Sequence, residues 1–489
     1  MKKSTFQGLL CTLFLFGCGG GGTSPAVGLE PIGPPPTPPP TPLFNTEPIV
    51  LNDPQTYYNN ACGSPTTSSV IPVDINGDNY DDFVIHYWCD QEEFGNSVRG
   101  ETKNIIVAFT SDGSGGYNVD NYNVFGESYP SLGGASRKFK VFDINGDGKD
   151  DIAYAMNNED GRSAYTWEDQ LSNGTQPTVL LSTETGFTIE RMGEQDWGHA
   201  VSITETGDVI FAGFNYGTQA FRLQGEQWVD VTLEYPSVSP SSHLIKNGTI
   251  ANAERRSDSF GFYLTKIIDD EWQRFAEYMF TKDFDVYWES WNNSGTGNYD
   301  PYPVTTLYGK KYFGAMFDTM CEFDGMLIAK LNAATLKDGS EPIEGGYYQQ
   351  TDTYPVNMLM FFALVDEEIV LQDSPITDEN INVNYNDWTC NDINNDYSND
   401  IVASVFSEPG IDTREYRGGV PIVYLNNGSG SLTSVDVSEW PTYSQEVSTA
   451  GFLHDIDNNG TSDLIIHALS TDQVRADIEI YTTNEDISG

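Results

Sequence analysis

Basic side chains are scarce in this chain. Its 489 residues include 24 Lys and Arg against 72 Asp and Glu, for a formal net charge of −48. Binding to nucleic acid needs a basic surface that releases counterions from the phosphates, so we expect no nucleic-acid partner. An anionic membrane surface would repel the chain for the same reason. The excess of carboxylates is instead suited to a salty habitat or to the uptake of cations.

The common catalytic motifs are missing as well. The sequence has no Gly-x-Ser-x-Gly, no His-Glu-x-x-His and no phosphate-binding Gly-x-x-x-x-Gly-Lys. Its few histidines are scattered, and we expect them to pack rather than to catalyse. They are His86, His199, His243, His454 and His467. No catalytic residue is therefore predicted, and an enzyme is less favoured than a binding protein.

Long hydrophobic runs are absent beyond the N-terminus. No later segment reaches the roughly 18 consecutive apolar residues that a transmembrane helix needs. Disorder along the whole chain is nevertheless excluded, because 38% of the residues are hydrophobic and 13% are aromatic. With 47 Gly, 27 Tyr and 26 Phe, the sequence favours an all-β fold of short strands joined by tight turns.

The N-terminus has the features of a bacterial lipoprotein signal over residues 1–17. Lys2 and Lys3 precede a short apolar stretch from Leu9 to Phe16, which is too short to span a bilayer. The residues Leu15-Phe16-Gly17-Cys18 resemble a lipobox, although Phe16 is bulkier than usual. This resemblance implies a lipidated Cys18 and an outer-membrane lipoprotein of the cell envelope, which contacts the membrane through its lipid only. An ordinary signal peptide cut nearby is the alternative.

Residues 18–44 are expected to form a tether. Gly19–Gly22 would be flexible, and the proline-rich run from Gly33 to Pro42 predicts an extended polyproline II segment. Residues 45–489 would then form the folded body. In an oxidising compartment its four cysteines are candidates for disulfides. Cys62 and Cys89 flank one predicted hairpin, and Cys321 with Cys390 is the remaining pair.

Four segments repeat one nine-residue pattern, with oxygen-bearing side chains at positions 1, 3, 5 and 9. Position 7 can add its backbone carbonyl. The candidate ligands are Asp74, Asn76, Asp78, Tyr80 and Asp82 in loop A; Asp143, Asn145, Asp147, Lys149 and Asp151 in loop B; Asp392, Asn394, Asp396, Ser398 and Asp400 in loop C; and Asp455, Asp457, Asn459, Thr461 and Asp463 in loop D. A β-rich run follows each loop.

This spacing is suited to calcium, which takes about six to eight hard oxygen ligands. Alternate residues of a curled loop point inward, so we expect up to four Ca²⁺ sites. An acidic turn cluster that merely solvates the hairpin tips is the alternative. An EF-hand is excluded, because position 12 would need a bidentate Glu. The chain has apolar or aromatic residues there, namely Ile85, Tyr154, Ala403 and Ile466.

The loops resemble the calcium repeats of the FG-GAP and VCBS families, which occur in integrin α-subunits and in many secreted bacterial proteins. The segment from Asp143 to Ala153 is the closest match. The Phe-Gly and Gly-Ala-Pro signatures that flank the integrin repeats are missing, so the bacterial VCBS form is the better fit. The resemblance implies a β-propeller stabilised by calcium.

The spacing of the loops predicts the number of blades. Loop starts at residues 74, 143, 392 and 455 give steps of 69, 249 and 63 residues, and the long step is four repeats of about 62 residues. Three repeats without a metal loop would lie between residues 156 and 385. We therefore predict seven four-stranded antiparallel blades, with six or eight as alternatives. An N-terminal strand near Glu47 to Tyr58 would complete the last blade and close the ring.

The middle of the chain is harder to assign. Ile203 to Val209 reads as a strand–turn–strand with the metal loop shortened away, and outer hairpins follow near Ala220–Val231 and Phe262–Met279. Cys321 to Ile328 reads as a further inner turn. The segment from Asp285 to Tyr302 reads as a long aromatic loop, suited either to sugar stacking or a protein contact, or to packing on the adjacent blade.

These features favour a calcium-stabilised, non-catalytic binding or adhesion module with an unknown protein or glycan ligand. A polysaccharide-active enzyme of the lyase kind is the main alternative, supported by fold analogy alone. A component of an assembly that docks a basic partner is the third.

Overall fold

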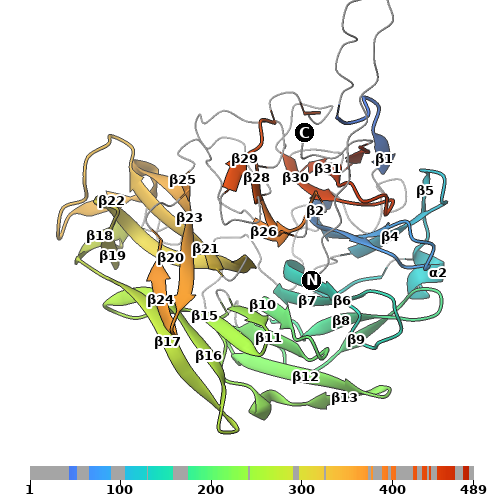
Figure 1. Ribbon diagram of the computed structural model, residues 1–489, viewed down its shortest axis with the longest axis horizontal. Coiled ribbons are helices and arrows are strands. Elements are labelled where there is room, and N and C mark those ends of the chain that lie inside the picture. The colour runs from blue at the N-terminus through green and yellow to red at the C-terminus, as the bar shows by residue number, and fades with distance from the viewer. Residues whose placement is uncertain are drawn as a thin grey trace, which may run out of the picture. The chain divides into compact units, whose positions relative to one another are not determined.

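The computed structural model (Figure 1) describes residues 43–51, 65–89, 105–128, 130–157, 174–240, 243–289, 297–323, 326–372, 376–377, 388–394, 398–403, 422–426, 432–437, 440–441, 449–468 and 477–483. Most of these residues lie in β-strands. The described helical elements are α2 (Asn121–Phe125), η2 (Thr232–Glu234) and η4 (Gln350–Asp352). Within the described residues, no helix has the length and apolar character needed to cross a membrane.

Six four-stranded antiparallel sheets, which we call blades, make up most of the body. The first four take their strands consecutively from the chain. Blade 1 has β2 (Pro65–Val73), β3 (Asp82–Cys89), β4 (Ile105–Ser111) and β5 (Tyr117–Val119); blade 2 has β6 (Ala135–Phe142), β7 (Asp151–Asn157), β8 (Thr178–Ser182) and β9 (Phe187–Arg191). Blade 3 has β10 (Gly198–Ile203), β11 (Val209–Gly213), β12 (Thr218–Gln224) and β13 (Gln227–Asp230); blade 4 has β14 (His243–Lys246), β15 (Thr249–Arg255), β16 (Ser259–Ile268) and β17 (Glu271–Thr281).

The last two blades come from the C-terminal part of the chain. Blade 5 has β26 (Trp388–Asn391), β27 (Asp400–Ala403), β28 (Ile422–Asn426) and β29 (Leu432–Ser434); blade 6 has β30 (Thr449–His454), β31 (Asp463–Ala468), β32 (Ile478–Tyr481) and the N-terminal β1 (Ile49–Leu51). Strand β1 pairs antiparallel with β32, with Val50 opposite Glu479. The two ends of the described chain therefore share one sheet.

A larger sheet separates blade 4 from blade 5 along the chain. Its eight strands have the order β22-β18-β19-β20-β21-β23-β24, and β25 also pairs with β23. They are β18 (Phe284–Glu289), β19 (Asp300–Leu307), β20 (Lys310–Phe323), β21 (Met326–Leu336), β22 (Tyr347–Gln349), β23 (Thr353–Val365), β24 (Glu368–Leu371) and β25 (Ile376–Thr377).

The prediction of seven four-stranded blades is therefore wrong, because the described residues form six such blades and the large sheet. The division of the 249-residue step between loops B and C into equal repeats assumed that every repeat has strands of similar length. Strands β20, β21 and β23 contain 14, 11 and 13 residues and pair with one another continuously. They build one wide sheet where a four-stranded blade was expected, and the turn predicted after Cys321 lies between two of its strands.

Consecutive sheets pack on one another through apolar interfaces. Along β3, Phe83 and Ile85 pack in the core shared with blade 6, whereas Val84 packs in the core shared with blade 2. Burial on both faces explains why the strands after the loops are apolar runs rather than alternating ones. Contacts run in chain order from blade 1 to blade 4, through the large sheet to blades 5 and 6, and from blade 6 back to blade 1. This arrangement is a β-propeller.

The predicted elements of blades 3 and 4 are confirmed. β10 ends at Ile203 and β11 begins at Val209, and β16 and β17 form the predicted hairpin. The prediction of one long loop from Asp285 to Tyr302 is wrong at both ends. Its first and last residues belong to β18 and β19, which pair antiparallel, and residues 290–296 lie outside the described part.

Candidate metal-binding loops

All four predicted loops join the first strand of a blade to its second strand. They connect β2 to β3, β6 to β7, β26 to β27 and β30 to β31. The position-12 residues Ile85, Tyr154 and Ile466 are fully buried in the following strands. The loops therefore join strands, as predicted, and among the described residues the strands take the place that the helices of an EF-hand would have.

The aspartate at position 9 has the same structural role in every loop. Asp82, Asp151, Asp400 and Asp463 are all 0% exposed. One carboxylate oxygen accepts the backbone N–H of position 2, at 3.0 Å from Ile75 N to Asp82 Oδ2. The other oxygen accepts a backbone N–H from the end of the third strand, at 2.6 Å from Ser111 N to Asp82 Oδ1. This side chain thus ties the loop to the third strand.

Sequence reasoning missed the third-strand partners of these aspartates. The residues that donate are Ser111, Ser182, Asn426 and Thr483. Each stands two residues after the strand residue that pairs with the residue following the aspartate. The recurring polar turn after the third strand was the available signal.

The backbone of the loops is shaped for inward-pointing oxygens. Positions 4 and 6 have positive φ in the three fully described loops, with 74° and 87° at Gly146 and Gly148 of loop B. Glycine and asparagine tolerate this conformation best. The position-1 carboxylate accepts the N–H groups of those residues, at 2.7 Å from Gly146 N and 2.9 Å from Gly148 N to the Asp143 oxygens.

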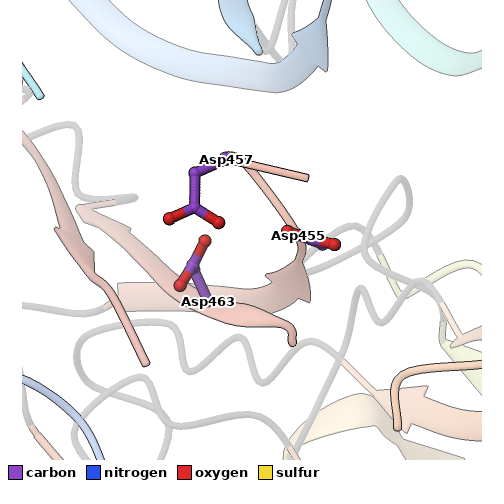
Figure 2. Close-up of side chains that lie close together, drawn as sticks. All are labelled: Asp455, Asp457 and Asp463. Atoms are coloured by element: carbon purple, nitrogen blue, oxygen red, sulfur yellow. The ribbon is translucent and has the colours of Figure 1, made fainter. Parts of the chain in front are cut away.

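Loop D brings its carboxylates closest together. One oxygen from each of Asp455, Asp457 and Asp463 lies within 4.8 Å of the other two (Figure 2). Within the described part of the chain, this is the one such group of acidic, histidine or cysteine side chains. Loops A, B and C have Asn at position 3, which offers an amide oxygen in place of a carboxylate.

Burial and crowding of negative charge change the acidity of these groups. Burial, with smaller contributions from the nearby Asp78 and Asp74, raises the pKa of Asp82 to about 7. Burial likewise raises the pKa of Asp463 to about 7, with contributions from Asp457 and Asp455. The residues therefore suit a cation, because a bound ion would neutralise charges that burial penalises.

Loop B keeps its lysine away from these carboxylates. Lys149 donates from Nζ to the carbonyls of Thr183 and Glu184, at 3.0 and 2.8 Å. Its ammonium is thus held on the neighbouring turn, which leaves the position-7 carbonyl as the group offered to an ion. The Ser182 hydroxyl lies 3.2 Å from Asp147 Oδ2.

Loop C is described in part. Asp392, Asn394, Ser398 and Asp400 are placed, and Asp400 makes the same two backbone contacts as its counterparts. Asp396 lies outside the described residues.

Blade 3 has a different arrangement at the matching place. Asp208 precedes Val209, which pairs with Phe221, as Asp82 precedes Phe83, which pairs with Phe109. Asp208 is 0% exposed and accepts from Arg222 Nε at 2.7 Å and from Arg222 Nη2 at 2.6 Å. Sequence reasoning missed this pair, because the spacing of metal ligands is absent there.

Two neighbours complete this cluster. The hydroxyl of Tyr235 also donates to Asp208, and Arg222 forms a second ion pair with Glu234 at 2.9 Å. These hydrogen bonds and ion pairs raise the pKa of Arg222 above its ordinary value, with the Asp208 bond as the largest cause.

The cysteines are resolved in part. Cys18 and Cys62 lie outside the described residues, and the side chains of Cys89 and Cys321 are not described. Cys390 is disulfide-bonded, and its strand β26 contacts β20, which carries Cys321. Both predicted pairings stay predictions.

The fold and the loops together define a β-propeller in which four of the six described blades have acidic hairpin tips. No protein-family model matches the chain, and no curated protein matches it. Among solved structures, the β-propeller domain of Cps50 (Swd1) from Myceliophteria thermophila is 12% identical, with 72% of this chain and 97% of that chain covered and a TM-score of 0.32.

Two further structures are similar to the same extent. A chain of the S. cerevisiae complex of Dbp5 with Nup159 and Gle1 is 7% identical, with 68% of this chain and 72% of that chain covered and a TM-score of 0.33. A post-proline cleaving enzyme from Rickettsia typhi is 9% identical, with 85% and 51% covered and a TM-score of 0.34. These scores are too low to carry an argument, so the fold rests on the strand pairing of this chain.

Proposed function

We propose that this protein is a calcium-binding β-propeller lipoprotein of the FG-GAP/VCBS type, which serves in the cell envelope as a binding or adhesion module. The observation that carries the calcium assignment is loop D, where three carboxylates of one hairpin tip lie within 4.8 Å of one another. Three acidic groups at this distance repel one another strongly unless a cation lies between them.

In each loop the ion would take its ligands from the same positions. Side chains at positions 1, 3, 5 and 9 would supply oxygens, and the carbonyl of position 7 would supply another. The position-7 residues are Tyr80, Lys149, Ser398 and Thr461. Water would complete the six to eight oxygens that calcium takes. The ion would hold each hairpin tip against the third strand, so that binding and folding are coupled.

The proposed anchor rests on the N-terminal sequence. Cys18 would carry the lipid, and residues 19–44 would hold the propeller away from the membrane. We also propose that β1 closes the ring, because its pairing with β32 adds the fourth strand of blade 6. A ring closed in this way leaves no unpaired edge at the junction.

Removal of the metal tests the calcium assignment. Excess EGTA should lower the melting temperature of the purified protein, since a ligand at about 100 times its Kd stabilises the folded state by roughly 2.7 kcal/mol. Asp143→Ala and Asp455→Ala should each reduce the difference between the calcium and EGTA curves. Asp258→Ala, at an exposed turn outside the loops, is the control. Identical melting curves with calcium and with EGTA would overturn the assignment.

A further inference from the structure

Three tyrosines lie close together at the β22 edge of the large sheet: Tyr347 on β22, Tyr287 on β18 and Tyr299 just before β19. Figure 1 shows where these strands lie. Tyr287 and Tyr347 are neighbours in the parallel pair β18–β22, and their rings stack with centroids 4.8 Å apart and planes 16° apart. Tyr299 approaches Tyr347 edge-on, with ring centroids 5.2 Å apart. The two rings cover each other's facing sides, and Tyr347, which is 66% exposed against 40% for Tyr287, presents the more open aromatic surface.

The other described aromatic side chains of β18, β19 and β22 lie on the opposite face of the sheet. Trp288 is only 7% exposed and stacks on Tyr302, and Tyr348 packs edge-on against Phe313. Successive residues of a strand face opposite sides of a sheet, so these rings belong to the core while Tyr287 and Tyr347 face outward. The packing expected of the aromatic segment therefore accounts for Trp288 and Tyr302, and it leaves Tyr287 on the outward face.

A fixed polar pair lies next to the tyrosines. Glu289 and Gln349 are the next outward-facing pair along β18 and β22, and Gln349 Nε2 donates to Glu289 Oε2 at 2.8 Å. Glu289 is 5% exposed, and its other oxygen accepts the N–H of Gly297 at 3.1 Å. Gln349 Nε2 also lies 3.4 Å from the Tyr299 hydroxyl. Contacts on both sides therefore hold the carboxylate and the amide in place.

We propose that this tyrosine platform binds a neutral oligosaccharide, which names the ligand class of the binding role proposed above and rests on that role. A pyranose ring presents apolar C–H groups to an aromatic face and hydroxyls around its rim. One sugar residue would lie on the exposed side of Tyr347, which Tyr287 supports by stacking, and its hydroxyls would reach the exposed amide of Gln349, which Glu289 holds in place. Such a site combines an apolar floor with a few fixed polar groups.

The charge of the protein decides between kinds of glycan. An acidic polysaccharide would approach a chain of net charge −48, and such a surface repels anions. A cationic ligand would need a free carboxylate, but Glu289 is buried and both of its oxygens accept neutral donors. Asp285, the outward residue before Tyr287, is paired with Lys282 at 3.0 Å. Of the acidic, cationic and neutral glycans, the neutral class therefore fits these groups best.

Isothermal titration calorimetry of the calcium-loaded full chain tests the proposal. The neutral probes are cellohexaose, laminarihexaose, xylohexaose and mannohexaose, and the charged probes are hexagalacturonate and a glucosamine hexamer. At least one neutral probe should bind. Tyr347→Ala should weaken that binding about tenfold or more, because it removes the ring that the sugar would cover. Tyr287→Ala should weaken it less, because this ring supports Tyr347 from behind. Gln349→Ala should have a smaller effect.

The controls separate this proposal from the calcium assignment. Tyr122→Ala changes a tyrosine of helix α2 that is 69% exposed, and it should leave sugar binding unchanged. Melting curves with calcium and with EGTA are recorded on the same samples. A normal calcium response without binding of any neutral probe overturns the ligand class alone. Binding that survives both tyrosine changes, or that occurs with charged probes only, overturns it as well.

Discussion

Blade 3 and the loop-bearing blades each bury an aspartate carboxylate at the start of the second strand, but they surround it with different groups. Eight residues separate Val73 from the buried Asp82 in blade 1, whereas four separate Ile203 from the buried Asp208 in blade 3. The long loop surrounds its aspartate with further oxygens and with backbone N–H groups. In the short one, Thr204 Oγ1 accepts the backbone N–H of Asp208, and a guanidinium from the third strand pairs with the carboxylate.

The comparison indicates which part of the repeat is architectural. A buried carboxylate at the start of the second strand is present in blades 1, 2, 3, 5 and 6, and it always contacts the third strand or its end. The positive charge that would balance this carboxylate differs between the blades. Arg222 supplies a covalently attached cation that is always present, whereas we propose that the loops take up an ion from solution.

The largest expected effect comes from removing the internal cation. Arg222→Met leaves Asp208 buried with Tyr235 as its remaining side-chain partner, and breaking a buried ion pair in this way costs roughly 3–5 kcal/mol. The loss in the free energy of unfolding should be the same in calcium and in EGTA. Urea denaturation under both conditions measures it.

A matched control exists for this change. Arg256 pairs with Glu254 and Glu277 at the surface, so Arg256→Met should cost about 1 kcal/mol or less. If calcium restored the stability of the Arg222 variant, blade 3 would itself be a metal blade and the comparison would fail.

A smaller effect should separate the two roles within one loop. Asp151 accepts N–H groups from Ile144, Asn145 and Ser182, so Asp151→Ala leaves buried donors unsatisfied and should cost about 2–4 kcal/mol even in EGTA. Asp147→Ala lies nearer the solvent and should cost stability mainly when calcium is present. Equal losses in EGTA would show that position 9 has no special structural role.

Position 9 was expected from the sequence only as a ligand. The spacing of the acidic residues predicted the hairpins, the strand that follows each one and the general fold, because those depend on local periodicity. It could not reveal that Asp82 also holds Ser111, since that contact joins residues 29 positions apart. The Asp208–Arg222 pair could not be predicted for a similar reason, because its two residues lie 14 positions apart.

The large sheet was not predicted, for a different reason. Asn, Ser and Gly between Asp285 and Tyr302 favour a loop, yet pairing with long neighbouring strands orders both ends of that segment. Strand length depends on such neighbours, so counting residues per repeat could not reveal a sheet of eight strands.

The smallest expected effect is a dependence on pH in EGTA. Folded-state pKa values of about 7 for Asp82 and Asp463 lie above the ordinary value of 3.8. Their contribution to stability is complete below pH 4 and is lost as the pH rises through 7, by roughly 1 kcal/mol for each group between pH 6 and 8. Asp463→Asn should remove its share of this slope.

Two buried histidines act in the opposite direction. Burial lowers the pKa of His86 to about 3 and that of His243 to about 4, so both groups add stability as the pH rises through 6.5. The quantity to measure is therefore the difference between the wild-type and Asp463→Asn slopes. Parallel slopes would mean that the loop carboxylates stay charged without a metal.

The pairing of β1 with β32 has a mechanical consequence. The chain enters the propeller at Phe44, which bridges to Thr483 and packs edge-on against Trp440 at 5.0 Å, and it continues into three residues paired with β32. Tension applied through the N-terminal segment would load this short strand and blade 6 before it reached any other sheet. If residues 18–44 form the tether that we propose, a pull on it would therefore begin to unfold the propeller where β1 pairs with β32.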